Sequence, residues 1–397
     1  MKKVLYLSYD GMTDALGYSQ VFVYLKSLSR EFKIFLVSFE KKDQKGTENF
    51  QSLRKQARDC GIFWIPLTYH KSPTIPATAF DIFQGVVVSF LLVLFNGIRL
   101  IHARSYVAMF MGWFVKMVFR TRLLFDMRGF WADERIEGGL WRKKSKIYRV
   151  TKWLEKRFIK DATAIVSLTQ KGKDVVLSFR NSNKTADEIE VIPTCADLGK
   201  FKPLEVEKKF SDRFVVGYSG SVGLWYDFPA SIRAFLAFQK LKPSPAPLFL
   251  ILNRGEHEKI KNHLKDFGIE PSDYLLVSAD SDEMPYWINQ MQVNVYFIRP
   301  SFSKQASSPT KFAEVLGCGV SVVTNLGVGD SDLLIGENRV GVLSPSFSEK
   351  DIDETVKLWL DLSLDPLLAQ RCIETARKYF SIEQGVQKYS ALYNRAL

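Results

Sequence analysis

The sequence predicts two consecutive α/β domains of the Rossmann-like, doubly wound kind, each with a parallel sheet and helices on both faces. Three observations lead to this prediction. The chain has 397 residues, which is too many for one ordinary hydrophobic core. Its content of 46% apolar and 25% charged residues is typical of a globular protein. Short strand-like runs alternate with helical patterns along nearly the whole chain, as in parallel sheets.

The first half opens with a strand-like run over residues 4–8, which reaches Asp10 too soon to be a signal peptide. Further runs rich in Val, Ile, Leu and Phe predict strands over 34–38, 62–67, 100–102, 123–126 and 164–167. The patterns between these runs predict helices over 19–29, 49–60, 107–119 and 144–160.

A charged stretch with Pro203, around residues 200–213, interrupts the alternation and is expected to link the domains. The expected domains are therefore residues 1–198 and 199–380, followed by a last helix over 381–397. Within the second domain, strands are expected at 214–218, 248–252, 274–277, 293–298 and 321–324. Helices are expected at 229–239, 256–267, 283–291, 309–316, 352–362 and 366–379.

Ligands of doubly wound sheets bind beyond the carboxyl ends of the strands, so the loops there hold the candidate site residues. Gly220, Ser221 and Gly223 follow the expected strand at 214–218. Glycine and serine let backbone N–H groups approach a phosphate closely. An ordinary tight turn is the alternative, and it applies equally to the glycine-containing loop at 326–330.

The segment Ser308-Pro309-Thr310-Lys311 opens a predicted helix, with Ser308 as N-cap and Pro309 as first helical residue. Lys311 and Glu314 are three residues apart and share one helix face. A lysine near a helix start can contact a diphosphate, and a carboxylate one turn later can accept hydrogen bonds from both ribose hydroxyls. The alternative is a surface Lys–Glu pair of little energetic value. The position next to the expected ligand edge favours a binding role.

In the first domain, Gly17, Arg104, Arg128 and Asp133 lie in loops that follow strands. Arginines and carboxylates there suit the hydroxyls of a sugar acceptor and a phosphate group. We favour this role for Arg104 and Arg128, whereas for Asp133 an internal salt bridge is equally supported. That alternative network would contain Asp126, Arg128, Asp133 and Arg135.

These motifs resemble the family-4 (group 1) retaining glycosyltransferases along nearly the whole chain. The most specific part is Ser308–Lys311 with Glu314, together with the segment 317–323 that follows. The other matching segments are the Gly17 loop, 191–197 with Phe201, Gly217–Gly223 and 282–285.

The resemblance implies a GT-B fold, in which two Rossmann-like domains face each other across a cleft and a C-terminal helix crosses back to the first domain. It implies a metal-independent hexosyltransferase that uses a UDP- or GDP-sugar as donor substrate, needs no cofactor, and retains the configuration of the transferred sugar. Arg128 and Lys311 would be catalytic, and Gly17, Arg104, Arg128 and Asp133 would bind the acceptor. The donor would contact Gly220, Ser221, Gly223, Ser308, Thr310, Lys311 and Glu314.

Two features depart from the family pattern. Ala306 stands where many relatives carry the first of two glutamates, and the loop 217–226 lacks the usual Arg and Lys. Either Lys311 and backbone amides replace them, or the donor is handled differently, or activity is lost. A subgroup with the Ser-Pro-Thr-Lys pattern looks similar, which favours an active enzyme. The alternatives are an inactive nucleotide-sugar-binding partner protein and, with less support, a sugar-nucleotide epimerase.

The excess of positive charge, +12 over the whole chain, lies in the first half of the sequence. Residues 1–200 hold 33 Lys and Arg against 19 Asp and Glu, whereas the remaining residues hold 22 against 24. Basic residues interleaved with tryptophan over 141–160 suit an anionic membrane surface, and a solvated face is the alternative. The apolar stretch 85–95 is too short to span a bilayer. Together with 107–124 it either packs in the core or faces lipid.

We therefore expect a cytoplasmic protein, peripheral at the inner face of the cell membrane, with a lipid-linked or surface-polysaccharide acceptor. No nucleic-acid-binding module is recognisable, so no nucleic-acid partner is expected. The four cysteines and four histidines are scattered without metal-like spacing, so no metal site is expected.

Overall fold

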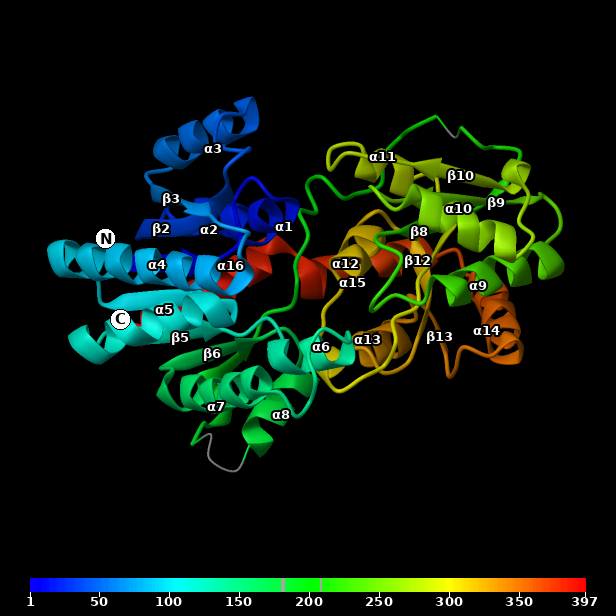
Figure 1. Cartoon of the computed structure of the whole chain (residues 1–397). Coiled ribbons are helices and arrows are strands. Elements are labelled where there is room, and N and C mark those ends of the chain that lie inside the picture. Colours follow the sequence, from blue (N-terminus) through cyan, green and yellow to red (C-terminus); the bar gives the residue numbers. More distant parts are fainter. Residues whose placement is uncertain (180–182, 208) are drawn as a thin grey trace. The chain divides into compact units, whose positions relative to one another are not determined.

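Two parallel β-sheets form the framework of the chain (Figure 1). The computed structural model describes residues 1–179, 183–207 and 209–397. The first sheet has the strand order β3-β2-β1-β4-β5-β6-β7, and the second has the order β10-β9-β8-β11-β12-β13. Neighbouring strands run parallel throughout both sheets. The predicted fold class of two Rossmann-like α/β sheets is confirmed.

The first sheet alternates its strands with helices in chain order. Its strands are β1 (Lys2–Ser8), β2 (Phe32–Lys41), β3 (Phe63–Tyr69), β4 (Leu100–Arg104), β5 (Arg122–Asp126), β6 (Ala164–Ser167) and β7 (Ile189–Val191). Its helices are α1 (Ala15–Gly17), η1 (Tyr18–Phe22), α2 (Val23–Leu28), α3 (Glu48–Asp59), α4 (Thr74–Asn96), α5 (Ser105–Phe119), α6 (Trp131–Glu137), α7 (Lys146–Asp161), α8 (Gln170–Ser178) and η2 (Ala186–Glu188). All six predicted strands are present, and β7 was not predicted.

The second sheet follows the same alternation. Its strands are β8 (Phe214–Ser219), β9 (Pro247–Leu252), β10 (Tyr274–Val277), β11 (Val293–Val295), β12 (Ser321–Asn325) and β13 (Gly341–Ser344). Its helices are α9 (Phe228–Leu241), α10 (His257–Asp266), η3 (Pro271–Asp273), α11 (Met284–Ile288), η4 (Ser303–Ala306), α12 (Thr310–Gly317), α13 (Ser331–Asn338), α14 (Glu349–Leu362) and α15 (Leu368–Phe380), and the last helix of the chain is α16 (Ile382–Ala396). The sequence did not predict α13 and β13.

The chain divides into two compact units. The first unit is Met1–Pro193 together with Ile382–Leu397, and the second is Thr194–Ser381. The division falls slightly before residue 198 because the intervening segment already packs on the second unit. The Thr194 backbone N–H donates to Ser308 Oγ at 3.2 Å, and the Phe201 carbonyl lies directly against Gly317 of α12.

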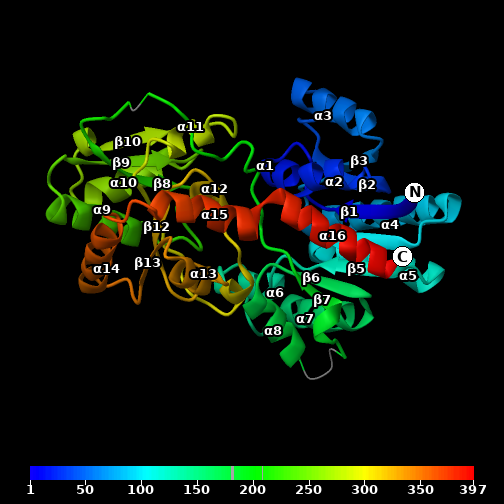
Figure 2. The same ribbon diagram turned by 180° about the vertical axis from the view of Figure 1, so that it is seen from behind.

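Helix α16 belongs to the first unit, as the resemblance implied. Figure 2 shows it next to α2, on one face of the first sheet. Tyr393 OH lies 2.6 Å from His102 Nδ1, and Tyr389 OH donates to Asp126 Oδ2 at 3.1 Å. The end of the chain therefore closes over strands β4 and β5.

The order of the strands decides where each unit can bind a ligand. β1 lies between β2 and β4, and β8 lies between β9 and β11. The chain leaves each of these central strands in one direction across the sheet and later returns on the other side. The loops after the strands diverge at such a point and leave room for a ligand beyond their carboxyl ends.

Candidate functional site

The loop after β8 brings Gly220 against the side chain of Lys311. Gly220 has a φ of +123°, which favours glycine, and a Cβ at this position would lie 2.1 Å from Lys311 Nζ. The Gly220 carbonyl accepts a hydrogen bond from Asn253 Nδ2 at 2.8 Å, and the Val222 N–H donates to Glu256 Oε2 at 2.9 Å. The loop is thus held in place from the β9 side, with a cation beside its backbone.

Lys311 is buried in a surround of tyrosines. Its Nζ lies 3.9 Å from the ring centroid of Tyr226, 5.4 Å from that of Tyr218 and 5.8 Å from that of Tyr296. Among the described residues, Nζ has no hydrogen-bond partner. Burial lowers the pKa of Lys311 to about 7, against the opposing effect of Glu314. The rings compensate only part of the lost hydration, so the site suits an added anion.

Glu314 follows Lys311 by one turn of α12. Burial raises the pKa of Glu314 to about 7, and the nearby Lys311 and Lys200 oppose this rise. Both candidate donor-binding groups of α12 therefore change charge near neutral pH.

The start of α12 differs from the prediction. The helix begins at Thr310 with Pro309 at the N-cap position, not at Pro309 with Ser308 as cap. The reason is that the Ser308 hydroxyl accepts a hydrogen bond from the backbone N–H of Thr194. Ser308 therefore fastens the linker segment to the site instead of capping the helix.

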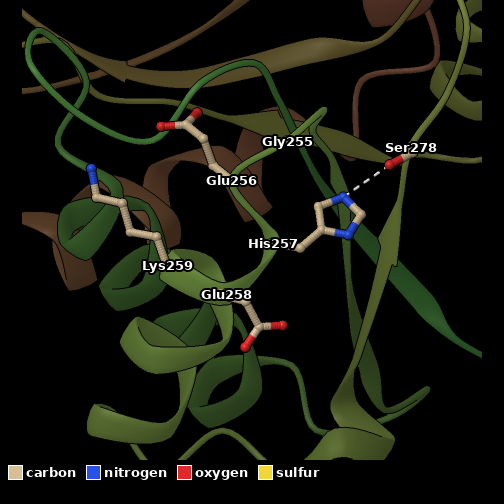
Figure 3. A pocket seen from close by; sticks show the side chains of 6 residues that line it. All are labelled: Gly255, Glu256, His257, Glu258, Lys259 and Ser278. Carbon is tan, nitrogen blue, oxygen red and sulfur yellow. Dashed lines mark hydrogen bonds between the residues drawn. The ribbon is translucent and has the colours of Figure 1, made fainter.

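A second cation, which the sequence did not indicate, lies beside the same loop. A Cβ on Gly223 would lie 2.5 Å from the Nζ of Lys259, a residue of α10. Figure 3 shows Lys259 directed away from His257, whose Nε2 lies 3.0 Å from Ser278 Oγ, and all three residues line a cavity of about 440 Å³. The loop 217–226 lacks Arg and Lys of its own, and Lys259 and Lys311 place two cations along it.

The other glycine-containing loop, after β12, serves a structural purpose. The Gly327 N–H donates to the Asp332 carboxylate at 3.1 Å, and the Gly329 N–H donates to the Lys304 carbonyl at 2.8 Å. These N–H groups are used within the fold, which supports the turn interpretation. Ala306, at the position of the family glutamate, is buried in η4.

In the first unit, Arg104 and Arg128 lie at the carboxyl ends of β4 and β5. Arg104 Nη1 lies 3.3 Å from Asp10 Oδ2, and Arg128 Nη1 lies 4.0 Å from Asp126 Oδ1. Arg128 has a φ of +58°, an unusual backbone conformation for a residue other than glycine. Burial alone would raise the pKa of Asp126, but Arg128 and His102 lower it below its usual value. A carboxylate that Arg128 and His102 keep ionised is thus built into this edge of the sheet.

Gly17 is the last residue of α1 and packs back against the loop after β1. A Cβ there would lie 1.8 Å from the carbonyl oxygen of Gly11, so only glycine fits. The same loop is held by the buried Glu40, which accepts hydrogen bonds from the N–H groups of Met12 at 2.7 Å and Thr13 at 3.2 Å. Gly17 shapes the loop, and Glu40 is a further determinant that the sequence did not indicate.

Asp133 lies in a different network from the two arginines. Its Oδ1 accepts from Tyr148 OH and its Oδ2 from Lys152 Nζ, both at 2.8 Å. These bonds join α6 to α7. Of the predicted salt-bridge network, the structure shows the Asp126–Arg128 pair, whereas Asp133 pairs with α7 and Arg135 stacks over Trp131 at 5.2 Å.

No protein-family model and no curated protein sequence matches the chain. Solved structures match it over its whole length. HepE of Anabaena in complex with UDP and glucose has a TM-score of 0.72 at 15% identity and covers 99% of this chain and 100% of its own. Sucrose-phosphate synthase from Thermosynechococcus elongatus has a TM-score of 0.72 at 14% identity, covering 100% and 99%. The lipopolysaccharide outer core galactosyltransferase WaaB has a TM-score of 0.65 at 10% identity, covering 99% of each chain.

The chain has the GT-B fold. Its structural neighbours include the galactosyltransferase WaaB and HepE, whose structure holds UDP and glucose. A putative UDP-N-acetylglucosamine 2-epimerase from Listeria monocytogenes is also similar, with a TM-score of 0.60 at 12% identity over 98% of this chain and 95% of its own. At these identities the likeness concerns the fold.

Within the GT-B units, the structure gathers the predicted donor-binding residues at one edge. Gly220 and Gly223 lie beside the amines of Lys311 and Lys259, and Ser308, Thr310 and Glu314 belong to the segment that opens α12. Ser221 is exposed in the loop between the two glycines. Within the described residues, no group of three or more His, Cys, Asp or Glu side chains could hold a metal ion.

Proposed function

We propose that the chain is a glycosyltransferase that moves a sugar from a nucleotide diphosphate sugar to an acceptor. The observation that carries the proposal is the buried amine of Lys311, which lies against the Gly220 backbone and has no hydrogen-bond partner among the described residues. A buried cation that no anion contacts directly is unfavourable, and Glu314 acts on Lys311 without a hydrogen bond to its amine. The diphosphate of a nucleotide sugar would supply the anion. HepE, which has the same fold, binds UDP-glucose.

The transfer breaks the bond between the anomeric carbon and the diphosphate oxygen, and the electron pair stays on that oxygen. The acceptor hydroxyl oxygen bonds to the anomeric carbon, and its proton passes to an oxygen of the leaving diphosphate. Lys311, Lys259 and the backbone N–H groups of Ser221 and Gly223 would stabilise the charge that develops on the leaving diphosphate, because the N–H groups of Gly220 and Val222 already donate to Leu252 and Glu256. Glu314 would accept hydrogen bonds from the ribose hydroxyls. These roles place most of the charge compensation on the second unit.

Arg104 and Arg128 would orient the acceptor at the edge of the first sheet. Their side chains are fixed by Asp10 and Asp126, so little conformational freedom is lost when an acceptor binds. We further propose family-4 membership, retention of configuration and independence of metal. The two lysines supply the positive charge that a metal would otherwise bring, and the anomeric configuration of the product tests retention directly.

Donor binding is tested by a thermal-shift panel of UDP, GDP and several of their sugars. A ligand at about 100 times its Kd stabilises the folded state by roughly 2.7 kcal/mol, so one nucleotide class should raise Tm clearly. Glu314→Ala should weaken that binding by about tenfold or more, because a charge-assisted hydrogen bond is lost. Glu258→Ala is the matched control, since Glu258 is exposed and pairs with Lys261. No shift with any nucleotide, or equal affinity of the two variants, would remove α12 from a donor site.

Two alternatives have distinct signatures in the same assays. An inactive partner protein would bind the nucleotide sugar but release no free nucleotide with any acceptor. An epimerase, which the Listeria neighbour brings into consideration, would convert the sugar nucleotide in the absence of an acceptor. Nucleotide release that depends on the acceptor would support the transferase.

The acceptor that we propose is lipid-linked or a surface polysaccharide, and the location is the cytoplasmic face of the cell membrane. The support comes from α7, where exposed cations follow one another along the helix: Lys146, Arg149, Lys156, Arg157 and Lys160. Such a row suits anionic lipid headgroups.

A further inference from the structure

The middle of helix α4 reverses the usual amphipathic pattern of a helix on a sheet. Its packed face carries Asp81, Gly85 and Ser89 there, with the apolar Ala77, Leu92 and Val93 towards its ends, all buried. Large apolar side chains occupy the exposed face, and Phe83 is 64% and Phe95 77% exposed. The full exposed set on α4 is Phe80, Phe83, Val87, Leu91, Leu94 and Phe95, which mostly recurs every three or four residues. In a helix surrounded by water, the expected arrangement is the opposite one.

The packed face of α4 is held to the first unit by Asp81 and Gly85. Asp81 Oδ2 accepts from Tyr9 OH at 3.0 Å, and Asp81 Oδ1 lies 2.5 Å from His70 Nδ1. Gly85 lies so close to Met111 that a Cβ would be 2.4 Å from its sulfur.

By length and composition the segment Pro76–Asn96, 21 residues, could cross a membrane. From the sequence, the apolar stretch was expected to cover only residues 85–95 and to be too short for a membrane span. The helix in the structure is longer than that stretch. If α4 left the first unit and crossed a bilayer, Asp81 would be buried in lipid and its hydrogen-bond partners would be exposed. We therefore expect α4 to stay packed on the first unit and to turn only its apolar face outward.

Helix α5 extends this apolar surface. The rings of Phe90 on α4 and Phe119 on α5 lie 4.7 Å apart, and Figure 1 shows the two helices next to each other. On α5, Phe114, Met117 and Val118 are exposed. We call the exposed apolar side chains of both helices the α4–α5 face.

Positive charge borders the α4–α5 face. Residues 74–125 contain five basic residues and one acidic residue, the buried Asp81. Arg99, Arg120 and Arg122 are exposed where α4 and α5 end, and the Arg122 N–H donates to the Arg99 carbonyl at 2.8 Å. The apolar side chains thus have basic residues around them, and residues 74–125 contribute no exposed acidic residue.

Helix α7 continues the same surface beyond α5. Trp113 Nε1 of α5 donates to Asp161 Oδ2 at 2.8 Å, which joins the two helices. Val150 and Trp153 are exposed on α7 and line a hollow of about 360 Å³ with Lys146 and Arg149. Cations therefore lie on a second side of the α4–α5 face.

We propose that the α4–α5 face inserts into the outer acyl region of an anionic lipid bilayer, while Arg99, Arg120, Arg122 and the cations of α7 contact the headgroups. An interfacial helix places apolar side chains in lipid and basic ones at the phosphate level. A second copy of the chain would bring like charges together, and a nucleic acid would leave the apolar side chains in water. This inference goes beyond the proposed sugar transfer, and vesicle binding tests it without any donor or acceptor.

The first test compares binding to vesicles of phosphatidylcholine with phosphatidylglycerol. The triple variant Phe83→Gln, Leu91→Gln, Leu94→Gln should bind roughly tenfold or more weakly, because three exposed apolar groups lose their burial in lipid. The matched control alters three exposed leucines of the second unit, Leu358→Gln, Leu364→Gln and Leu367→Gln, and should bind like the unaltered chain. Equal binding by both variants would overturn the proposal.

The second test measures how deeply the α4–α5 face inserts into the bilayer. A fluorophore on the Leu91→Cys variant, in a Cys60→Ser background, should be quenched by lipids that carry a nitroxide in the acyl chain. The same fluorophore on Lys55→Cys, in the exposed part of α3, should not be quenched. Vesicle binding without quenching at residue 91 would mean adsorption through cations alone and overturn the insertion. Self-association that the triple variant abolishes, without vesicle binding, would assign the face to a second copy instead.

Discussion

The amine of Lys311 lies in an environment unlike that of an exposed lysine, because it is buried and packed against aromatic rings. Three tyrosine rings face its amine, and the negative faces of the rings attract a cation but do not replace a full hydration shell. Burial lowers its pKa to about 7 and raises that of Glu314 to about 7. A diphosphate beside Nζ would favour the protonated amine, so the free site is poised to take up a proton with its ligand.

This pKa has a consequence for stability that needs no nucleotide. The pKa of Lys311 is about 7 in the folded chain and 10.5 without the fold, so the unfolded chain binds more protons between these values. Stability therefore rises with pH in this window, by up to about 1.4 kcal/mol per pH unit. Lys311→Met lacks this contribution. On a Glu314→Gln background, the Tm of the lysine form should gain on the methionine form between about pH 7 and 9. A difference in Tm that is constant with pH would contradict a titrating Lys311.

For single residues, the sequence indicated candidate site residues only where they lie close together along the chain. Lys311 and Glu314 lie on one helix turn, and their spacing was enough to predict both. Lys259 lies 36 positions after Gly223, and only the packing of α10 beside the loop brings the two together. Glu40 was likewise missed, because a buried carboxylate at a strand end has no distinctive local pattern.

Among the elements, the loops after the central strands have the most tightly constrained backbone. The loop after β1 folds back on α1, and Gly17 makes contact with the Gly11 carbonyl at a distance that no side chain tolerates. Glu40 replaces water as the partner of the N–H groups of this loop. The edge that would meet the acceptor is therefore built before any ligand arrives.

Gly17→Ala should destabilise the chain by about 2–4 kcal/mol, because the added methyl group forces the loop away from α1. Urea unfolding followed by circular dichroism measures this change. Gly46→Ala is the matched control, since no atom lies within 4 Å of the added Cβ, and its effect should be small. Similar unfolding midpoints for the two variants would show that the loop relaxes freely.

Strands were easier to predict than helices. Central strands of a parallel sheet are buried on both faces, so they read as continuous apolar runs, and β9 is an example. α4 was harder, because its exposed face is apolar and its buried face mixes the polar Asp81 and Ser89 with apolar residues, which removes the usual periodic signal. β7 has only three residues, too few to form a recognisable run.

Over the whole molecule, charge is divided between the two units much as the sequence suggested. The cations that α7 exposes and those at the ends of α4 and α5 all belong to the first unit. The opposing acids of α7 are not exposed in the same way, because Glu155 is buried against Tyr106 and Lys152. The first unit is therefore the one that an anionic surface would attract.

Lys156→Glu with Lys160→Glu should weaken binding to anionic vesicles by about 30-fold or more, since each lysine near such a surface contributes about 1 kcal/mol. Vesicle co-sedimentation measures the change, and added salt should diminish it. The matched pair Lys350→Glu with Lys357→Glu, on α14 of the second unit, should have little effect. If both pairs act alike, net charge alone and not the α7 surface governs binding.

The return of α16 makes the second unit an insertion within the first. Residues 194–381 are contiguous, whereas the first unit is completed only when residues 382–397 join it. During synthesis the second unit can thus fold as soon as it leaves the ribosome, while the earlier residues wait, with the pocket for Tyr389 and Tyr393 still open. The order of folding would then be the reverse of the order of translation, and the apolar α4–α5 face would be available to a chaperone or a membrane throughout that wait.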